Sequence, residues 1–368
     1  MAGLYVHIPF CAKKCEYCDF YSEAGRSERI PVFMEALERE WTLYTASSGG
    51  IGGFVDTVYL GGGTPSLVEP PLIKKFLGSV RPFLSKGDAS EITLEANPST
   101  LTRGKLRGFL EAGVNRISIG LQSFNDAALR FLGRLHNAAE GEASVRLARE
   151  AGFGNLGVDL IYAYPGHTAE DWSSALEKAV SLDPDHVSTY ALSWSHSTPM
   201  GKKIEAGLLH RPSEEAAADM LLLAVEKLEK AGYEHYEISN FAKPGRRSMH
   251  NERYWTGKPY LGLGPSAHSL IGNKRFWNVY NFEKYIQLLG QNRLPIEDEE
   301  LLSPEDRKLE RLALGLRTKE GIFLSELDLD EGKVSILVKN GLAVLRGGRL
   351  ALTAKGMLLA DEIAVGLV

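Results

Sequence analysis

Short apolar segments alternate with amphipathic ones along the first half of the chain. Six apolar runs rich in β-branched residues predict strands buried on both faces, over residues 4–8, 55–60, 91–95, 116–120, 157–161 and 186–192. Between them, apolar positions at helical spacing predict helices over residues 32–44, 72–83, 102–112 and 169–181. Six strand–helix units in succession predict an α/β protein built as a partial (β/α)6, TIM-like barrel. In such a barrel the chemistry lies on the loops that follow the strands.

The pattern changes after residue 192. It predicts a helix over residues 213–231, a strand over 233–239 and an irregular, aromatic-rich stretch over 247–281. Helices are then expected over 304–316, 324–327 and 331–339, followed by a β-hairpin around Gly347-Gly348 and a last helix, a pattern typical of a small winged-helix-like module. We therefore predict three parts: a barrel over residues 1–232, a barrel extension over 233–300 and a C-terminal winged-helix-like domain over 301–368.

Charge and hydropathy exclude several classes of protein. The 368 residues carry a net charge of −5, and residues 300–368 hold ten basic against eleven acidic side chains, which disfavours nucleic acid as a partner and favours a packing or lid role for the C-terminal module. No apolar run approaches the roughly 18 residues that a spanning helix needs, so no membrane span is expected. The first residues lack the pattern of a secretory signal, and we expect a cytoplasmic protein.

All three cysteines of the chain fall within one short segment after the first predicted strand: Cys11, Cys15 and Cys18. An odd, clustered set argues against disulfides and for thiolates gathered on one metal centre. Three thiolates can hold three irons of a [4Fe–4S] cluster and leave the fourth iron to an exchangeable molecule. The aromatic side chains of Tyr17 and Phe20 would shield such a cluster. Zinc, with His7 as a fourth ligand, is the main alternative, although zinc cysteines usually come as separated pairs.

Polar and glycine-rich motifs lie on or near the next four predicted strands: Glu95 ends the third, Gln122 ends the fourth, Asp159 lies on the fifth, and Arg134 falls in the helical region between the last two. Gly61-Gly62-Gly63-Thr64-Pro65 follows the second strand, and its glycines would let the backbone approach a ligand closely. The motif lacks the lysine of a phosphate-binding P-loop, and a tight strand–helix turn would use the same residues. Further polar groups that would converge on the barrel mouth, although each alone is more often a solvated or capping residue, are Glu95, Gln122, Arg134 and Asp159.

The CxxxCxxC spacing directly after the first strand resembles the cluster motif of the radical S-adenosylmethionine (SAM) superfamily. The resemblance implies a partial (β/α)6 radical SAM barrel, a [4Fe–4S] cluster on the three cysteines, and SAM chelating the open iron. By motif position, the SAM contacts that it implies are Tyr5, Tyr17, Gly62, Gly63, Thr64, Glu95, Gln122, Arg134 and Asp159.

Several motifs resemble one branch of this superfamily, the oxygen-independent coproporphyrinogen III dehydrogenases (HemN) and the related HemW-type heme chaperones. Three features favour the chaperone type. Phe20 stands where the dehydrogenase has a further cysteine, and the cluster cysteines begin at residue 11, which leaves no room for the dehydrogenase's N-terminal extension. The third is an HNxxYW motif, in which the resemblance implies heme contacts at His250, Asn251, Tyr254 and Trp255.

The HNxxYW motif also has a direct chemical interpretation. An imidazole is a common axial ligand of heme iron, so His250 is a candidate metal ligand, and the rings of Tyr254 and Trp255 offer flat apolar faces for the macrocycle. An aromatic-rich irregular stretch makes an exposed site plausible there. The alternative is a core histidine surrounded by packing aromatics.

The resemblance thus predicts a heme chaperone that carries a [4Fe–4S] cluster and SAM, binds heme and passes it to apo-hemoproteins such as respiratory enzymes. The cluster would act structurally or as a switch, for instance toward a homodimer, and no residue is assigned a catalytic role. The alternative is an enzyme, an oxygen-independent coproporphyrinogen III oxidase or dehydrogenase, that decarboxylates propionates through a SAM-derived radical.

Overall fold

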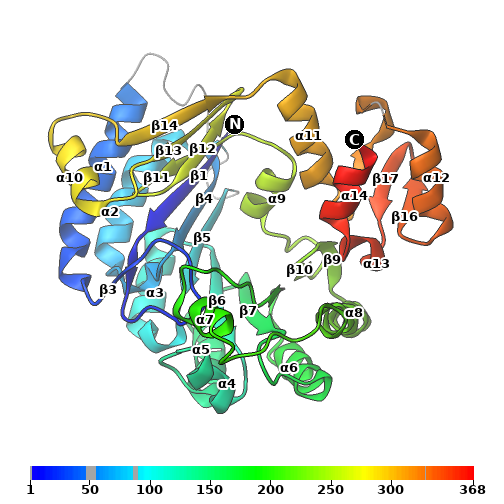
Figure 1. Cartoon of the computed structure of the whole chain (residues 1–368). Coiled ribbons are helices and arrows are strands. Elements are labelled where there is room, and N and C mark those ends of the chain that lie inside the picture. The colour runs from blue at the N-terminus through cyan, green and yellow to red at the C-terminus, as the bar shows by residue number, and fades with distance from the viewer. Residues whose placement is uncertain (1, 47–54, 86–89, 328) are drawn as a thin grey trace. The chain divides into compact units, whose positions relative to one another are not determined.

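The computed structural model describes residues 2–46, 55–85, 90–327 and 329–368 (Figure 1). The chain divides into two compact units that interleave in sequence. The first unit comprises residues 1–160, 192–210 and 259–301, and the second comprises residues 161–191, 211–258 and 302–368.

Parallel strands form the centre of the first unit. Six strands lie side by side in the order β11 (Tyr260–Leu263), β1 (Ala2–Ile8), β4 (Val55–Gly62), β5 (Glu91–Ala96), β6 (Arg116–Gln122) and β7 (Leu156–Tyr162). The helices between them, which pack side by side, are α1 (Ile30–Ala46), α2 (Pro70–Val80), α3 (Arg103–Ala112) and α5 (Ala138–Ala151). The first five predicted strands are therefore confirmed, and their near-continuous burial is what strands covered on both faces require.

The segment from residue 259 to 301 extends this sheet. After β11, the strands β12 (His268–Ile271), β13 (Lys274–Asn278) and β14 (Ile296–Leu301) add in antiparallel fashion, and α10 (Phe282–Gly290) lies between the last two. The prediction of irregular structure over 247–281 is wrong. These strands are short and connected by tight turns, with left-handed backbone at Gly264 and Gly272, so they lack the long apolar runs that identify buried strands.

The second unit contains the sixth predicted strand. That strand, β8 (His186–Ala191), pairs antiparallel with β10 (Asn240–Ala242), which in turn pairs with β9 (Glu234–Glu237). Helices α6 (Ala169–Ser181) and α8 (Glu214–Lys230) pack together, and the indole N–H of buried Trp172 donates to the carbonyl of Met220 across them at 2.9 Å. The predicted helices and strand in this region are confirmed.

The last residues of the second unit form a small module with its own core. Its elements are α11 (Pro304–Gly315), β15 (Ile322–Phe323), α12 (Glu331–Lys339), the hairpin β16 (Ala343–Arg346) and β17 (Arg349–Leu352), α13 (Ala354–Met357) and α14 (Ala360–Leu367). Leu316 and Leu350 have no exposed surface in this core. The helix expected over 324–327 is a single 3-10 turn, Leu324–Glu326, but the order of helices and hairpin is the predicted winged-helix-like one.

Candidate functional site

The three cysteines lie on one loop of the first unit. Cys11 ends the short strand β2 (Phe10–Cys11), which pairs with β3 (Glu23–Ala24), and the amide of Cys18 donates to the carbonyl of Cys15 at 3.3 Å. All three thiols are free and partly exposed. Among the described residues, no three cysteine, histidine or acidic side chains converge as ligands of a single metal ion. A zinc ion would need its thiolates close together, about 2.3 Å from one centre, whereas a four-iron cluster holds them farther apart.

Polar groups contact two of these thiols. The hydroxyl of Thr64 donates to Sγ of Cys11 at 3.5 Å, and the guanidinium of Arg134 lies 3.7 Å from Sγ of Cys15. Burial raises the pKa of the Cys11 thiol, and burial raises that of Cys18 to about 11. These thiols are therefore protonated in the free protein, and iron binding would release their protons. Free thiols with a neighbouring donor and a neighbouring cation fit a [4Fe–4S] cluster.

The glycine motif holds the cluster loop through its backbone. The amide of Gly63 donates to the carbonyl of Ile8 at 2.8 Å, and the amide of Thr64 donates to the carbonyl of Phe10 at 2.7 Å. A Cβ on Gly63 would lie 2.6 Å from the carbonyl oxygen of Phe10. Because backbone cannot yield as a side-chain tip can, only glycine allows the two loops to approach this closely.

Glu95 gathers several of the predicted SAM contacts. Its carboxylate accepts the hydroxyl of Tyr59 at 2.7 Å and the amide of Gly62 at 3.1 Å. Burial, with a smaller contribution from the charge of Asp159, raises the pKa of Glu95 to about 7. The ring of Tyr5 stacks on that of Tyr59, with centroids 6.2 Å apart. Four predicted contacts, those at residues 5, 62, 95 and 159, are thus brought together.

A second group surrounds Arg134. Its guanidinium donates to the carbonyl of Gly120 at 2.9 Å. Burial raises the pKa of Tyr17, and the positive charge of Arg134 opposes that rise. Gln122 has left-handed backbone, with φ of 65°, and its amide nitrogen would lie 2.7 Å from a Cβ on Gly120. Tyr17, Gln122 and Arg134 therefore adjoin the Cys15 side of the loop. A small pocket there is lined by Ala12, Lys13, Cys15, Thr64, Asn97, Ser99, Thr100, Gly133, Arg134 and Leu135.

Two sequence expectations for this loop need correction. His7 cannot serve as a zinc ligand as it stands, because Nε2 lies 2.9 Å from the carbonyl of Tyr21 and Nδ1 lies 3.1 Å from the hydroxyl of Tyr5. Burial lowers the pKa of His7 to about 4, so the ring is neutral, with Nε2–H donating and Nδ1 accepting. Phe20 is 64% exposed and does not shield the thiols.

Sequence reasoning missed the roles of Tyr59 and Ser118. Tyr59 reaches Glu95, and the hydroxyl of Ser118 donates to Asp159 at 3.1 Å. Both residues lie inside predicted strands, where a tyrosine or serine gives no signal beyond strand propensity. Only the strand register shows that they face the site: Ser118 pairs with Glu95, and Tyr59 pairs with Thr93, which lies on the same face of its strand as Glu95.

The HNxxYW motif lies in the second unit, on the short helix α9 (Met249–Trp255). Ser248 caps the helix by accepting the amide of Asn251, which explains why the segment is helical. His250 has no exposed surface, and its Nε2 lies 3.0 Å from the hydroxyl of Tyr254. The expectation of an exposed, irregular heme segment is therefore wrong, because the segment is a capped helix and His250 lies on its buried side, with Arg253 one turn on.

Comparisons with known proteins agree with this arrangement. The family model described as the radical SAM superfamily matches residues 5–179. The solved structure of coproporphyrinogen III oxidase (HemN) from Escherichia coli, described as a radical SAM enzyme, is 26% identical, covers 99% of this chain and 89% of its own, and has a TM-score of 0.84. The fold is thus the predicted α/β, partial-barrel fold of the radical SAM superfamily.

Two curated relatives show to which family within the superfamily the chain belongs. A heme chaperone HemW from Bacillus subtilis is 35% identical over 99% of this chain and 98% of its own length. The mitochondrial radical S-adenosyl methionine domain-containing protein 1 of Danio rerio is 35% identical over 98% of this chain and 86% of its own. The chain belongs to the HemW family of radical SAM proteins. In the part of the chain that the structure describes, no helix has both the length and the apolar character to cross a bilayer.

Proposed function

We propose that the protein is a heme chaperone, which binds heme through the HNxxYW helix and transfers it to apo-hemoproteins. The observation that carries this proposal is His250 on α9, an imidazole that contacts Tyr254 and that belongs, with Tyr254 and Trp255, to the motif of the HemW type. Full-length similarity to a protein named heme chaperone HemW supports it. Heme is the cargo in this proposal, and the acceptor is an apo-hemoprotein, for example of a respiratory chain.

Cys11, Cys15 and Cys18 would hold three irons of a [4Fe–4S] cluster, and SAM would complete the fourth. When bound and reduced, such a cluster supplies one electron to SAM. The chain's own part is to position the ligand: Glu95 and Gly62 fix one side of the site, and Arg134 and Gln122 fix the side beside Cys15. In this function the cluster stabilises the loop or switches the protein between states, including a homodimer.

Heme binding through Nε2 of His250 requires that Tyr254 release that nitrogen, since a hydrogen-bonded lone pair or proton cannot ligate iron at the same time. Ligation through Nε2 also requires the neutral ring to carry its one proton on Nδ1, so that the lone pair of Nε2 is available to iron. We place this function in the cytoplasm, where free thiols such as these persist.

One experiment separates the chaperone from the enzyme. Anaerobically reconstituted protein is incubated with SAM, reductant and coproporphyrinogen III, and in parallel the protein is titrated with heme. Saturable heme absorbance that His250→Ala abolishes, with no formation of protoporphyrinogen, supports the proposal. His235→Ala is the matched control, because His235 is also buried in the second unit but lies outside the motif. Turnover of coproporphyrinogen would establish the enzyme instead.

A further inference from the structure

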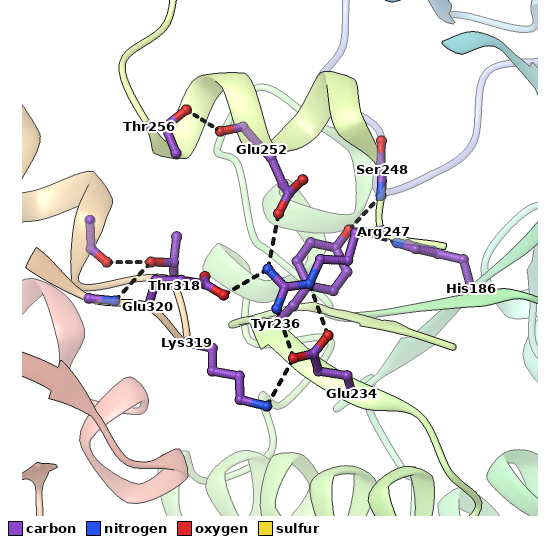
Figure 2. Close-up of polar contacts among 12 residues, drawn as sticks. His186, Glu234, Tyr236, Arg247, Ser248, Glu252, Thr256, Thr318, Lys319 and Glu320 are labelled. Atoms are coloured by element: carbon purple, nitrogen blue, oxygen red, sulfur yellow. Dashed lines mark hydrogen bonds and ion pairs between the residues drawn. The ribbon is translucent and has the colours of Figure 1, made fainter. Parts of the chain in front are cut away.

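Arg247, the residue before the cap of α9, stands at the centre of an ion-pair cluster in the second unit (Figure 2). Its guanidinium binds both carboxylate oxygens of Glu234 on β9, at 2.8 and 3.0 Å. The same group contacts Glu252 on α9 at 3.1 Å and Glu320 at 2.8 Å. Arg247 therefore connects a strand, the HNxxYW helix and the segment after α11.

The segment after α11 is itself fixed to the end of β9. The amide of Ile238 donates to the carbonyl of Arg317 at 3.1 Å, and the amide of Lys319 donates to the carbonyl of Tyr236 at 3.0 Å. The ammonium of Lys319 also lies 3.0 Å from the Glu234 carboxylate, as Figure 2 shows. These two backbone hydrogen bonds thus fix the segment that carries Glu320, whose carboxylate contacts Arg247.

Residues of α11 and of the segment after it hold the other end of α9. The guanidinium of Arg307, on α11, donates to the carbonyl of Gly257 at 3.2 Å, just after the helix ends. The guanidinium of Arg317 lies 5.4 Å from the ring centre of Trp255, within the range of a cation–π contact. Residues 302–320 therefore contact α9 at both ends, and we call this segment the clamp.

The burial of His250 on α9 has a functional consequence. His250 has no exposed surface, so heme iron cannot reach Nε2 unless α9 or Tyr254 moves. The ion pair between Arg247 and Glu320 is partly exposed, since the two side chains are 21% and 48% exposed. Such pairs are individually weak, so together they can hold a short helix in place and still allow it to open locally.

We propose that the clamp holds α9 in the position in which its residue His250 is buried, and that release of the clamp, by breaking the Arg247–Glu320 contact, exposes His250 to heme. This inference rests on the proposed function, which places heme at His250. Arg247 holds the pKa of Glu234 down at about 2, so that carboxylate remains ionised at physiological pH. Because the ion pairs of Arg247 are partly exposed, salt screens them, and we expect raised ionic strength to release the clamp.

The closed state is tested without heme, in the full-length protein. Hydrogen exchange of the α9 amides and the rate at which diethyl pyrocarbonate modifies His250, read by peptide mass spectrometry, both report opening. Glu320→Gln weakens one ion pair and is expected to raise both rates about two- to fivefold, and Arg247→Met, which removes every pair of Arg247, about tenfold. Raising salt should increase both rates in the original protein and have little effect in Arg247→Met.

Glu297→Gln is the matched control, because Glu297 forms an ion pair with Lys284 at 2.7 Å in the first unit and has a similarly exposed side chain. It should leave both rates unchanged. If Glu320→Gln and Arg247→Met fold but match the control, the clamp is overturned even if heme binds at His250.

Heme association is then measured by stopped flow in the same variants. Faster association in Glu320→Gln, in proportion to its faster exchange, supports the clamp as the gate. Faster exchange with unchanged association overturns the gating role. Absence of heme binding in every variant, including the most open one, overturns the proposed function itself.

Discussion

The hydroxyl of Tyr254 lies 3.0 Å from Nε2 of His250, the nitrogen that would ligate heme iron. The two residues are one helical turn apart, so the helix places the two side chains on one face, within reach of each other. The HNxxYW motif thus contains both the proposed heme ligand, His250, and a hydroxyl, that of Tyr254, that competes with heme iron for Nε2 of His250.

Removing this competitor should strengthen heme binding. We expect Tyr254→Phe to bind heme about fivefold more tightly, because one hydrogen bond is worth about 1 kcal/mol and its loss frees Nε2. Anaerobic heme titration followed by the Soret absorbance gives the dissociation constant. Tyr280→Phe, which changes an exposed tyrosine of the first unit, serves as the control. Weaker binding by Tyr254→Phe would show that the phenol contacts bound heme, contrary to this prediction.

The glycine loop should be essential for assembly of the cluster. In Gly63→Ala the added methyl meets the carbonyl oxygens of Phe10 and Ile8, at 2.6 and 2.9 Å, and must push the two loops apart. We expect at least a severalfold lower iron and sulfide content after anaerobic reconstitution, with the fold retained by circular dichroism. Gly154→Ala is the control, since nothing lies within 4 Å of a Cβ at that position. Equal iron content in both variants would contradict the role given to Gly63.

The Tyr59–Glu95 hydrogen bond makes a separate prediction about SAM. Tyr59→Phe leaves the cysteines untouched but removes a donor at 2.7 Å from the Glu95 carboxylate. We expect SAM affinity to fall about fivefold, the effect of one hydrogen bond, while iron content stays the same. Equilibrium dialysis of reconstituted protein measures the affinity. A simultaneous loss of iron would mean that Tyr59 supports the cluster loop instead of the SAM side.

The parallel strands could be predicted from the sequence because strands buried on both faces consist almost entirely of apolar residues. Val58 and Leu60 of β4, for example, have no exposed surface. The strand β14 shows the opposite case: Glu297, Asp298, Glu299 and Glu300 are exposed on it, as charged residues on an edge strand often are. Its backbone pairs with β13 regardless of its side chains, so no hydrophobic pattern could have identified it.

The candidate site was predictable only in its chemistry. Cys11 and Glu95 follow from motif spacing, but their partners Thr64 and Tyr59 depend on strand register and loop contact, which a single sequence does not specify. The burial of His250 likewise depends on which face of α9 the rest of the second unit covers. A motif names the residues of a site, whereas tertiary packing decides which of them are accessible.

Glu40 of α1 offers a test of the packing between the helices and the sheet extension of the first unit. Its carboxylate has no exposed surface and accepts the amide of Gly264 at 2.9 Å, the side-chain amide of Asn278 at 2.6 Å and the hydroxyl of Tyr285 at 2.7 Å. Burial outweighs these three donors and raises the pKa of Glu40 from 4.5 to about 7. The folded protein therefore holds this proton more tightly than the unfolded chain does.

The sign of the pH dependence follows from this shift. The contribution of the protonated Glu40 to stability is fully present below the unfolded pKa of about 4.5 and is lost as the pH rises through about 7. Relative to Glu40→Gln, which does not titrate, the free energy of unfolding of the original protein should fall by about 3 kcal/mol between pH 4.5 and pH 8. Urea unfolding of both proteins across this range measures the difference, and Glu35→Gln, an exposed position on the same helix, controls for the loss of one charge. A difference between the original protein and Glu40→Gln that stays constant with pH would mean that the carboxyl group ionises in the folded protein as easily as in the unfolded chain, so that the three donors, and not burial, set its charge.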